Sequence, residues 1–174
     1  MRTRFTHKDQ SGFTLLELII AIAIAGLITA GISAAIMQTL TINHRASNHM
    51  VAVRQVQQAG KEVSKDALQA QNVTCGEDSG FPLTLNWTDW SGTVNHVTYD
   101  ITDDNELHRS HTTSNGTPPA TAPAIVAQYI DPEHTSCSFN TSAWVLTFTV
   151  TAALGTESET RIYEIEPRPT PPGG

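Results

Sequence analysis

The alternation of apolar and polar residues changes in kind twice along the chain. Residues 18–37 form a run of twenty without a charged side chain, and most of them are apolar. A helix of that length is about 30 Å long, which matches the hydrocarbon core of a bilayer. The run therefore predicts a transmembrane helix over residues 13–37, with one acid, Glu17, just inside its start.

Apolar residues continue at helical spacing beyond this run, but on one side only. They recur at intervals of three or four: Val53, Val56, Gly60, Val63, Ala67 and Ala70. The charged residues of this stretch lie mostly off the stripe: Arg54, Lys61, Glu62, Lys65 and Asp66. This pattern predicts an amphipathic helix over residues 38–71.

The two stretches are predicted to form one helix from Phe13 to about Gln71, because the first proline of the chain is Pro82. Two helices separated by a break near Thr41 remain the alternative. Gly60 in a helix interior costs about 1 kcal/mol relative to alanine. It therefore indicates either close packing or a local bend at that position.

Twofold alternation replaces the helical period from residue 72 onward, and it predicts antiparallel strands with one buried face. Six strands are expected, at residues 81–87, 97–101, 106–110, 125–130, 144–150 and 161–166. The fold class is thus α+β, a long N-terminal helix packed on an antiparallel β-sheet head of residues 72–166. Residues 110–123 are expected to form an exposed loop, and residues 167–174 a disordered tail. Of the three tryptophans, Trp90 is expected to be the exposed one, since it precedes a turn.

Charge is distributed unevenly along the chain. The leader, residues 1–12, has three basic residues and one acid, and a positive flank holds the N-terminus in the cytoplasm and sends the remainder outward. From residue 72 onward, thirteen acids stand against three arginines, a net charge of −10. We expect no nucleic-acid partner for such a head, because DNA binding requires Lys and Arg to displace counterions.

Residues 12–17 read GFTLLE, and the apolar helix follows at once. This arrangement resembles the class III signal of type IV pilins and pseudopilins. The resemblance implies that a membrane-embedded prepilin peptidase cuts after Gly12 and methylates the new amine of Phe13. It also implies that the subunit waits in membrane lipid and then joins other pilin or pseudopilin subunits on an inner-membrane assembly platform.

The resemblance gives Glu17 a docking role, in which its carboxylate pairs with the Phe13 amine of a neighbouring subunit. A lone acid at the centre of a membrane helix costs about 2.5–3.5 kcal/mol, and less near the edge. A partner makes such a charge tolerable. An acid that merely reaches the lipid–water interface is the alternative interpretation.

Two features favour a minor subunit within this family. Major pilins commonly carry a proline midway along the membrane helix, where this chain has Ala34. The layout around residues 66–110 resembles minor pilins of the J and W kinds. The filament, a type IV pilus or a type II secretion-like pseudopilus, is left open. The alternatives are a competence minor pilin that binds DNA, and a membrane-anchored domain with another function, such as an enzyme.

The two cysteines, Cys75 and Cys137, are predicted to form a disulfide, since an even pair in an exported domain indicates one bridge. Such a bridge would stabilise the fold by about 4 kcal/mol in the chain-entropy model. It is expected to join the end of the helix to the sheet. Two free buried thiols are the alternative.

Metal and catalytic candidates are sparse in the head. His108 and His111 would lie on opposite faces of one strand, so we expect them and His96 to be solvated rather than to bind a metal. The oxygen-rich loop Asp100–Glu106 has ligands of the kind calcium prefers, but its Asp-Asp-Asn segment is also ordinary turn chemistry, and calcium binding is left open. No nucleophile motif or phosphate-binding loop is present, so we expect neither an enzyme nor a cofactor.

Overall fold

The computed structural model describes residues 12–77, 79–114 and 123–168. The chain divides into two units, residues 1–44 and residues 45–174, which we call the N-terminal unit and the C-terminal unit. Residues 1–11 of the predicted leader, most of the predicted 110–123 loop and the end of the predicted tail fall outside the described residues.

One helix, α1 (Leu15–Ala67), covers most of both predicted helical stretches and has no break near Thr41. It ends four residues before the predicted end, where tighter backbone hydrogen bonds, such as Gln69 N–H to the Asp66 carbonyl (3.1 Å), close its last turn. The absence of proline up to Phe81 explains this length, since proline would remove a helical hydrogen bond.

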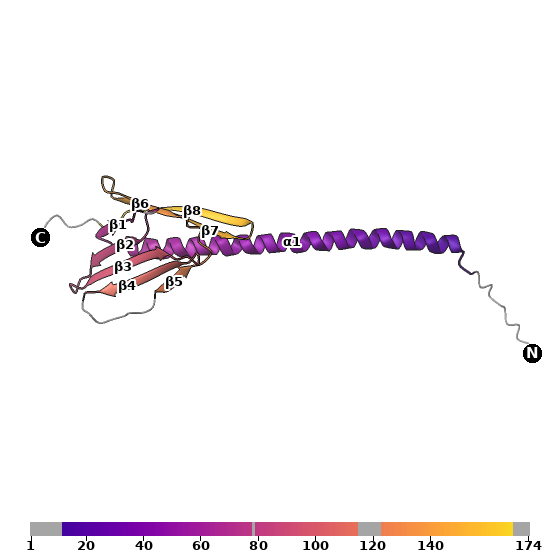
Figure 1. The fold of residues 1–174 in the computed structure, drawn as a ribbon, viewed down its shortest axis with the longest axis horizontal. Helices are drawn as coiled ribbons and strands as arrows, with labels where there is room; N and C mark the ends of the chain where they lie inside the picture. Colours follow the sequence, from indigo (N-terminus) through magenta and orange to yellow (C-terminus); the bar gives the residue numbers. More distant parts are fainter. Residues whose placement is uncertain (1–11, 78, 115–122, 169–174) are drawn as a thin grey trace, which may run out of the picture. The chain divides into compact units, whose positions relative to one another are not determined.

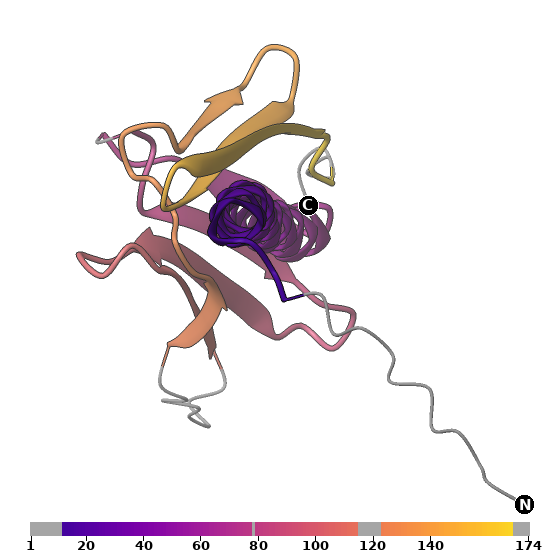
Figure 2. The same cartoon turned by 90° about the vertical axis from the view of Figure 1, so that its right-hand side faces the viewer.

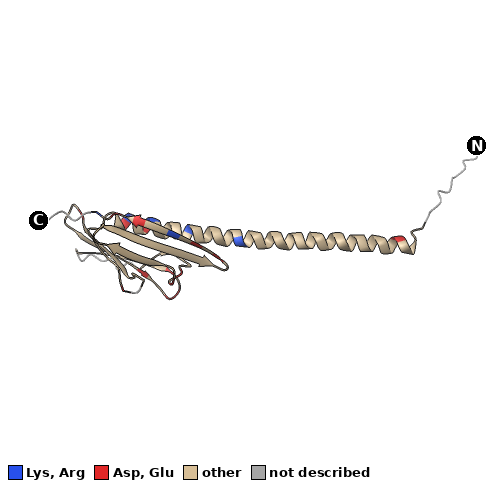
Figure 3. Ribbon diagram, turned by 90° about the horizontal axis from the view of Figure 1, so that it is seen from above, with Lys and Arg blue, Asp and Glu red and all other residues tan. Residues whose placement is uncertain are grey.

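In the N-terminal unit every described residue, from 12 to 44, is exposed. The helix there is long and apolar enough to cross a membrane by length and composition. Figure 3 shows that this stretch carries no acidic or basic residue between the acid near its start and the basic residues of the C-terminal unit. Its large side chains are exposed, for example Leu27 (76%) and Ile22 (64%).

The C-terminal unit contains two antiparallel sheets (Figure 1). The first has the strand order β1-β2-β3-β4-β5, formed by β1 (Asn72–Thr74), β2 (Leu83–Thr88), β3 (Val94–Ile101), β4 (Leu107–Thr113) and β5 (Ala124–Ala127). The second has the order β6-β7-β8, formed by β6 (Ser136–Asn140), β7 (Val145–Leu154) and β8 (Glu157–Ile165). The predicted α+β class is therefore confirmed, with two sheets in place of one.

Several predicted strand boundaries were wrong. The described residues form eight strands rather than six, because the short β1 and β6 were missed. The start of the predicted 110–123 loop belongs to β4, which continues to Thr113. Trp144 lies in the turn before β7 with a φ of 56°, where it was expected to begin that strand.

The part of α1 within the C-terminal unit lies between the two sheets (Figure 2). Apart from Asp66, its buried residues are small and let both sheets approach closely: Ala52, Val56, Ala59, Gly60, Val63 and Ala67. Of the two alternatives for Gly60, the structure shows close packing, since a Cβ there would lie 2.0 Å from the Tyr163 ring of β8. The Tyr163 hydroxyl also donates a hydrogen bond to the Val56 carbonyl (3.2 Å).

Candidate functional site

The predicted cleavage residues lie just outside the helix. Gly12 and Phe13 precede α1 in non-helical backbone, and Phe13 is 90% exposed. A Cβ built on Gly12 would have no neighbour within 4 Å, so the fold of the chain does not require glycine there. The bond between the two residues is accessible, and the chain itself puts no steric limit on the side chain at position 12.

Thr14 and Glu17 form a capping box at the start of α1. The Glu17 Oε2 atom accepts hydrogen bonds from the Thr14 backbone N–H and from the Thr14 hydroxyl, both at 3.1 Å. In return, the Glu17 backbone N–H donates to the Thr14 hydroxyl at 3.3 Å. This reciprocal pattern satisfies N–H groups that have no partner inside the helix.

The cap gives Glu17 a local role that sequence analysis missed. The signal was present, since a threonine followed three residues later by glutamate before an apolar run is a helix-start pattern. The Oε1 atom of Glu17 has no hydrogen-bond partner among the described residues. One carboxylate oxygen therefore stabilises the helix start, and the other remains available.

Comparison with protein families matches residues 7–33 to the prokaryotic N-terminal methylation motif. The chain carries a class III prepilin signal. This is the signal of the type IV pilin and pseudopilin family, and it implies a structural subunit that is processed by prepilin peptidase and assembles with other pilins. Comparisons with curated proteins and with solved structures gave no match.

Downstream of the prepilin signal, the structure brings the two cysteines together as thiols. Their Sγ atoms lie 2.8 Å apart, and the Cys137 thiol also donates to the Gly80 carbonyl at 2.7 Å. The Cys75 sulfur beside it, together with burial, raises the pKa of Cys137. Cys75 follows β1 and Cys137 lies on β6, so a bridge would join the two sheets, and not helix to sheet as expected.

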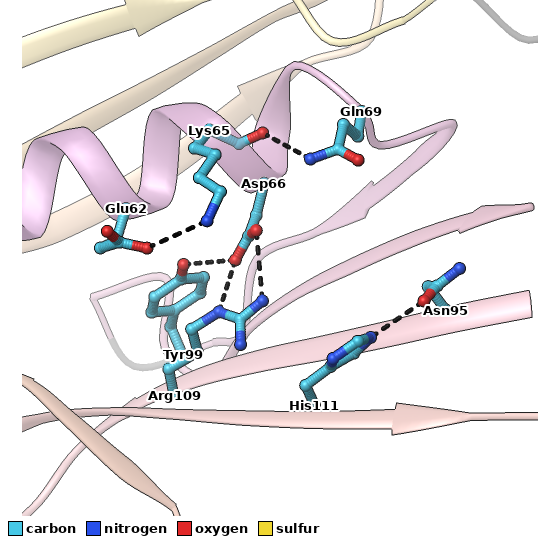
Figure 4. A network of polar contacts seen from close by, with 8 residues as sticks. All are labelled: Glu62, Lys65, Asp66, Gln69, Asn95, Tyr99, Arg109 and His111. Carbon is cyan, nitrogen blue, oxygen red and sulfur yellow. Dashed lines mark hydrogen bonds and ion pairs between the residues drawn. The ribbon is translucent and has the colours of Figure 1, made fainter. Parts of the chain in front are cut away.

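Asp66 is the main polar residue that the sequence prediction misplaced. It was assigned mostly to the exposed side of α1, yet it is only 2% exposed. Figure 4 shows its carboxylate held by side chains of β3 and β4. Arg109 donates from Nε to Oδ2 (2.7 Å) and from Nη2 to Oδ1 (3.2 Å), and the Tyr99 hydroxyl donates to Oδ2 (2.6 Å).

This network ties the end of α1 to the first sheet. Burial, together with the Asp66 carboxylate, raises the pKa of Tyr99, so its hydroxyl stays protonated and can donate. A buried carboxylate needs such partners, because an unpaired charge in a protein interior is strongly unfavourable. The side chains of Asp66, Tyr99 and Arg109 are hydrogen-bonded to one another, and their role is therefore structural.

The three candidate histidines do not converge. His108 contacts Glu106 (3.0 Å), His111 contacts Asn95 (3.0 Å) and stacks on Trp87, and His96 contacts Asn86. Within the described parts of the chain, no three His, Cys, Asp or Glu side chains are placed to hold a metal ion.

The predicted Asp100–Glu106 loop begins with the last two residues of β3 and continues as a closed turn to β4. The Thr102 N–H donates to the Glu106 carbonyl (3.0 Å), and Asn105 has a φ of 60°. The Glu106 carboxylate contacts His108 and accepts a hydrogen bond from Gln128 Nε2 (2.8 Å). The contact with His108 and the hydrogen bond from Gln128 both lower the pKa of Glu106. Its carboxylate is thus turned toward β4 and β5, where protein donors occupy it.

Proposed function

We propose that this chain is a minor pilin or pseudopilin subunit of a type IV pilus or a type II secretion-like filament. The observation that carries the proposal is the class III prepilin signal, followed directly by an exposed helix without charged residues up to residue 44. The signal implies processing, and the helix suggests a single-pass anchor with the head outside the cytoplasm. Ala34, where major pilins commonly have proline, supports the minor type.

Processing after Gly12 would begin the mature chain at Phe13, which would then be methylated on its amine. The accessibility of the Gly12–Phe13 bond supports this step. Because the chain leaves space around position 12, a requirement for glycine there would come from the peptidase. That makes the position a clean test of recognition, since a substitution should not disturb the fold.

Docking would use Glu17, whose free Oε1 atom is available to a cation. The partner would be the Phe13 amine of an adjacent subunit in the same membrane. The capping box holds Glu17 in place. No basic side chain among the described residues forms an ion pair with its carboxylate. An attraction between these two groups in lipid is strong, because the dielectric constant there is low.

The deciding experiment replaces Gly12 with leucine in the full chain, expressed with a prepilin peptidase. We expect Gly12→Leu to stay uncut, and wild type to lose residues 1–12 and gain one methyl group, as read by intact mass. Gly26→Leu is the matched control, because a Cβ at Gly26 also meets nothing within 4 Å. A Gly12→Leu chain that begins at methylated Phe13 would disprove the peptidase step.

A further inference from the structure

The hairpin turn between β2 and β3 presents a fully exposed tryptophan. Trp90 is 99% exposed. The turn around it is held rigidly, because the Asp89 Oδ1 atom accepts hydrogen bonds from the backbone N–H groups of Ser91 (2.8 Å) and Thr93 (3.0 Å). The Asp89 N–H also donates to the Thr93 carbonyl (3.0 Å). An indole on a fixed turn loses little conformational entropy on binding, which suits it as an anchor.

A cavity of about 420 Å³ opens elsewhere on the same unit, between α1 and β5. Its walls include two exposed apolar residues, Ile125 (51%) and Tyr129 (43%). The side chain of Gln55 accepts a hydrogen bond from the Gln128 N–H (3.0 Å) and fixes α1 to the segment after β5. Arg54 lines the cavity and forms no ion pair among the described residues.

The lining of this cavity has the chemistry that recognises an indole ring. A guanidinium such as that of Arg54 is attracted to the face of tryptophan. Tyr129 offers an aromatic surface, and aromatic pairs gain about 0.5–1.5 kcal/mol beyond the area they bury. The volume falls in the range of pockets that hold small organic groups.

The tryptophan and the cavity lie at opposite ends of the first sheet. The turn that bears Trp90 adjoins Val94, the first residue of β3, whereas β5 pairs with β4 at Leu107–Arg109, beside the last residues of β3. A strand of 8 residues separates the two ends, which is about 25 Å. Figure 1 shows the β2–β3 turn and β5 at the two ends of this sheet.

We propose that the cavity between α1 and β5 binds Trp90 of a second copy of this chain, so that heads join end to end. Asp89 brings a negative charge beside the indole, and Arg54 supplies the positive charge it would meet. Because the two features lie on different ends, one copy can bind a second while its own cavity binds a third. Such a contact does not close on itself and builds a row of subunits.

The inference rests on the proposed function for its place in a filament, but the contact can be tested separately. The full chain, in membranes that contain its peptidase, would carry the photoreactive residue benzoylphenylalanine in place of Trp90. A second, isotopically labelled copy would be present. We expect crosslinks to residues 51–58 or 124–129 of the labelled copy. The same probe in place of Ile162 on β8, which is 65% exposed, is the control and should give none there.

A reciprocal experiment would put the probe in place of Ile125 and map crosslinks to the β2–β3 turn. Trp90→Ala should lower this yield about tenfold, as expected for loss of an aromatic anchor, and Trp90→Phe should restore much of it. Arg54→Glu should lower it as well. Because Trp90 and Arg54 are both exposed, these changes leave the fold intact.

Crosslinks only to lipid or to another protein, or none, would overturn the inference. Intact mass of the same samples reports removal of residues 1–12. A correctly processed chain without self-crosslinks would therefore disprove the end-to-end contact and leave the proposed function standing. An unprocessed chain with self-crosslinks would support the end-to-end contact and contradict the proposed function.

Discussion

The two parts of α1 show how one helix can serve two surroundings. Up to residue 44, its large Ile and Leu side chains are exposed and the C-terminal unit begins only at residue 45. Beyond residue 51, small Ala, Val and Gly residues are buried. Large residues suit a surface that lipid or another helix must cover, whereas small residues let β-sheets of the same chain approach. Side-chain size, more than helix propensity, separates the two parts.

The two parts of α1 also differ in the surroundings of one acidic residue in each. Glu17 is exposed, and within the described part of the chain its carboxylate contacts Thr14, one turn away. Asp66 is buried, and its carboxylate meets Tyr99 and Arg109, which are far away in the sequence. The first acid can take a partner from outside the subunit, while the second has all its partners within it.

The largest expected effect concerns the cysteines of the C-terminal unit. We predict that oxidation bonds Cys75 to Cys137 and raises the free energy of unfolding of this unit by about 4 kcal/mol. Denaturant unfolding with and without reductant, followed by tryptophan fluorescence, measures it. A variant with both cysteines changed to serine should not respond to reductant. Two titratable thiols per chain in oxidised, unfolded protein would contradict the bond.

The next effect tests the buried acid. Asp66→Asn should lower the free energy of unfolding by about 3 kcal/mol, because it leaves the Arg109 charge without its partner. Glu62→Gln is the control, since its pair with Lys65 is 3.8 Å long and joins a half-buried acid to an exposed lysine, and should cost about 0.5 kcal/mol or less. Equal losses in the two variants would mean that burial does not distinguish these pairs.

Matched glycine substitutions compare the two parts of α1 directly. Gly60→Ala should cost about 2 kcal/mol, because the new methyl group displaces the Tyr163 ring. Gly26→Ala meets nothing within 4 Å and should favour the helix by up to about 1 kcal/mol. Chemical denaturation in detergent micelles measures the change in the free energy of unfolding for Gly60→Ala. Circular dichroism measures the change in helix content for Gly26→Ala. A similar response at both positions would remove the distinction between the two parts.

The smallest effect on stability is expected at Glu17. Glu17→Gln removes the charge but keeps the capping box, because glutamine also serves at that position. We predict normal processing and normal membrane level, with fewer neighbouring subunits recovered by co-purification. Thr14→Val is the companion variant, since it weakens the cap and keeps the charge. If Glu17→Gln recovers neighbours as well as wild type does, the acid has no docking role.

Sequence patterns predicted the parts of the fold that depend on a repeated signal. The long helix, its buried stripe and the longer strands all show a clear period. The strand β1 did not, because the three residues Asn72–Thr74 are too few for an alternation. The strand β6 was missed as well, although Cys137 and Phe139 alternate with polar neighbours within Ser136–Asn140. The division into two sheets depends on contacts between distant segments, such as Tyr163 with Val56, that no local pattern encodes.

The candidate site shows the same limit. The prepilin signal is contiguous, so residues 12–17 could be recognised directly. Asp66 lies beside the stripe residues Val63 and Ala67, but its burial depends on Arg109, which is 43 residues away. The proximity of Cys75 to Cys137 was predictable from their even number alone, whereas the segments they join were not.

The capping box at Thr14 has a consequence for how subunits would be staggered. It fixes helical geometry from Leu15 onward and places Glu17 about one turn beyond Thr14, whereas Phe13 lies in non-helical backbone just before the helix. One turn corresponds to about 5 Å of helical rise. Two parallel subunits joined by amine and carboxylate would therefore be offset by about one turn. Repetition of that step would produce a staircase of helices, in which each new subunit enters at a different height from the last.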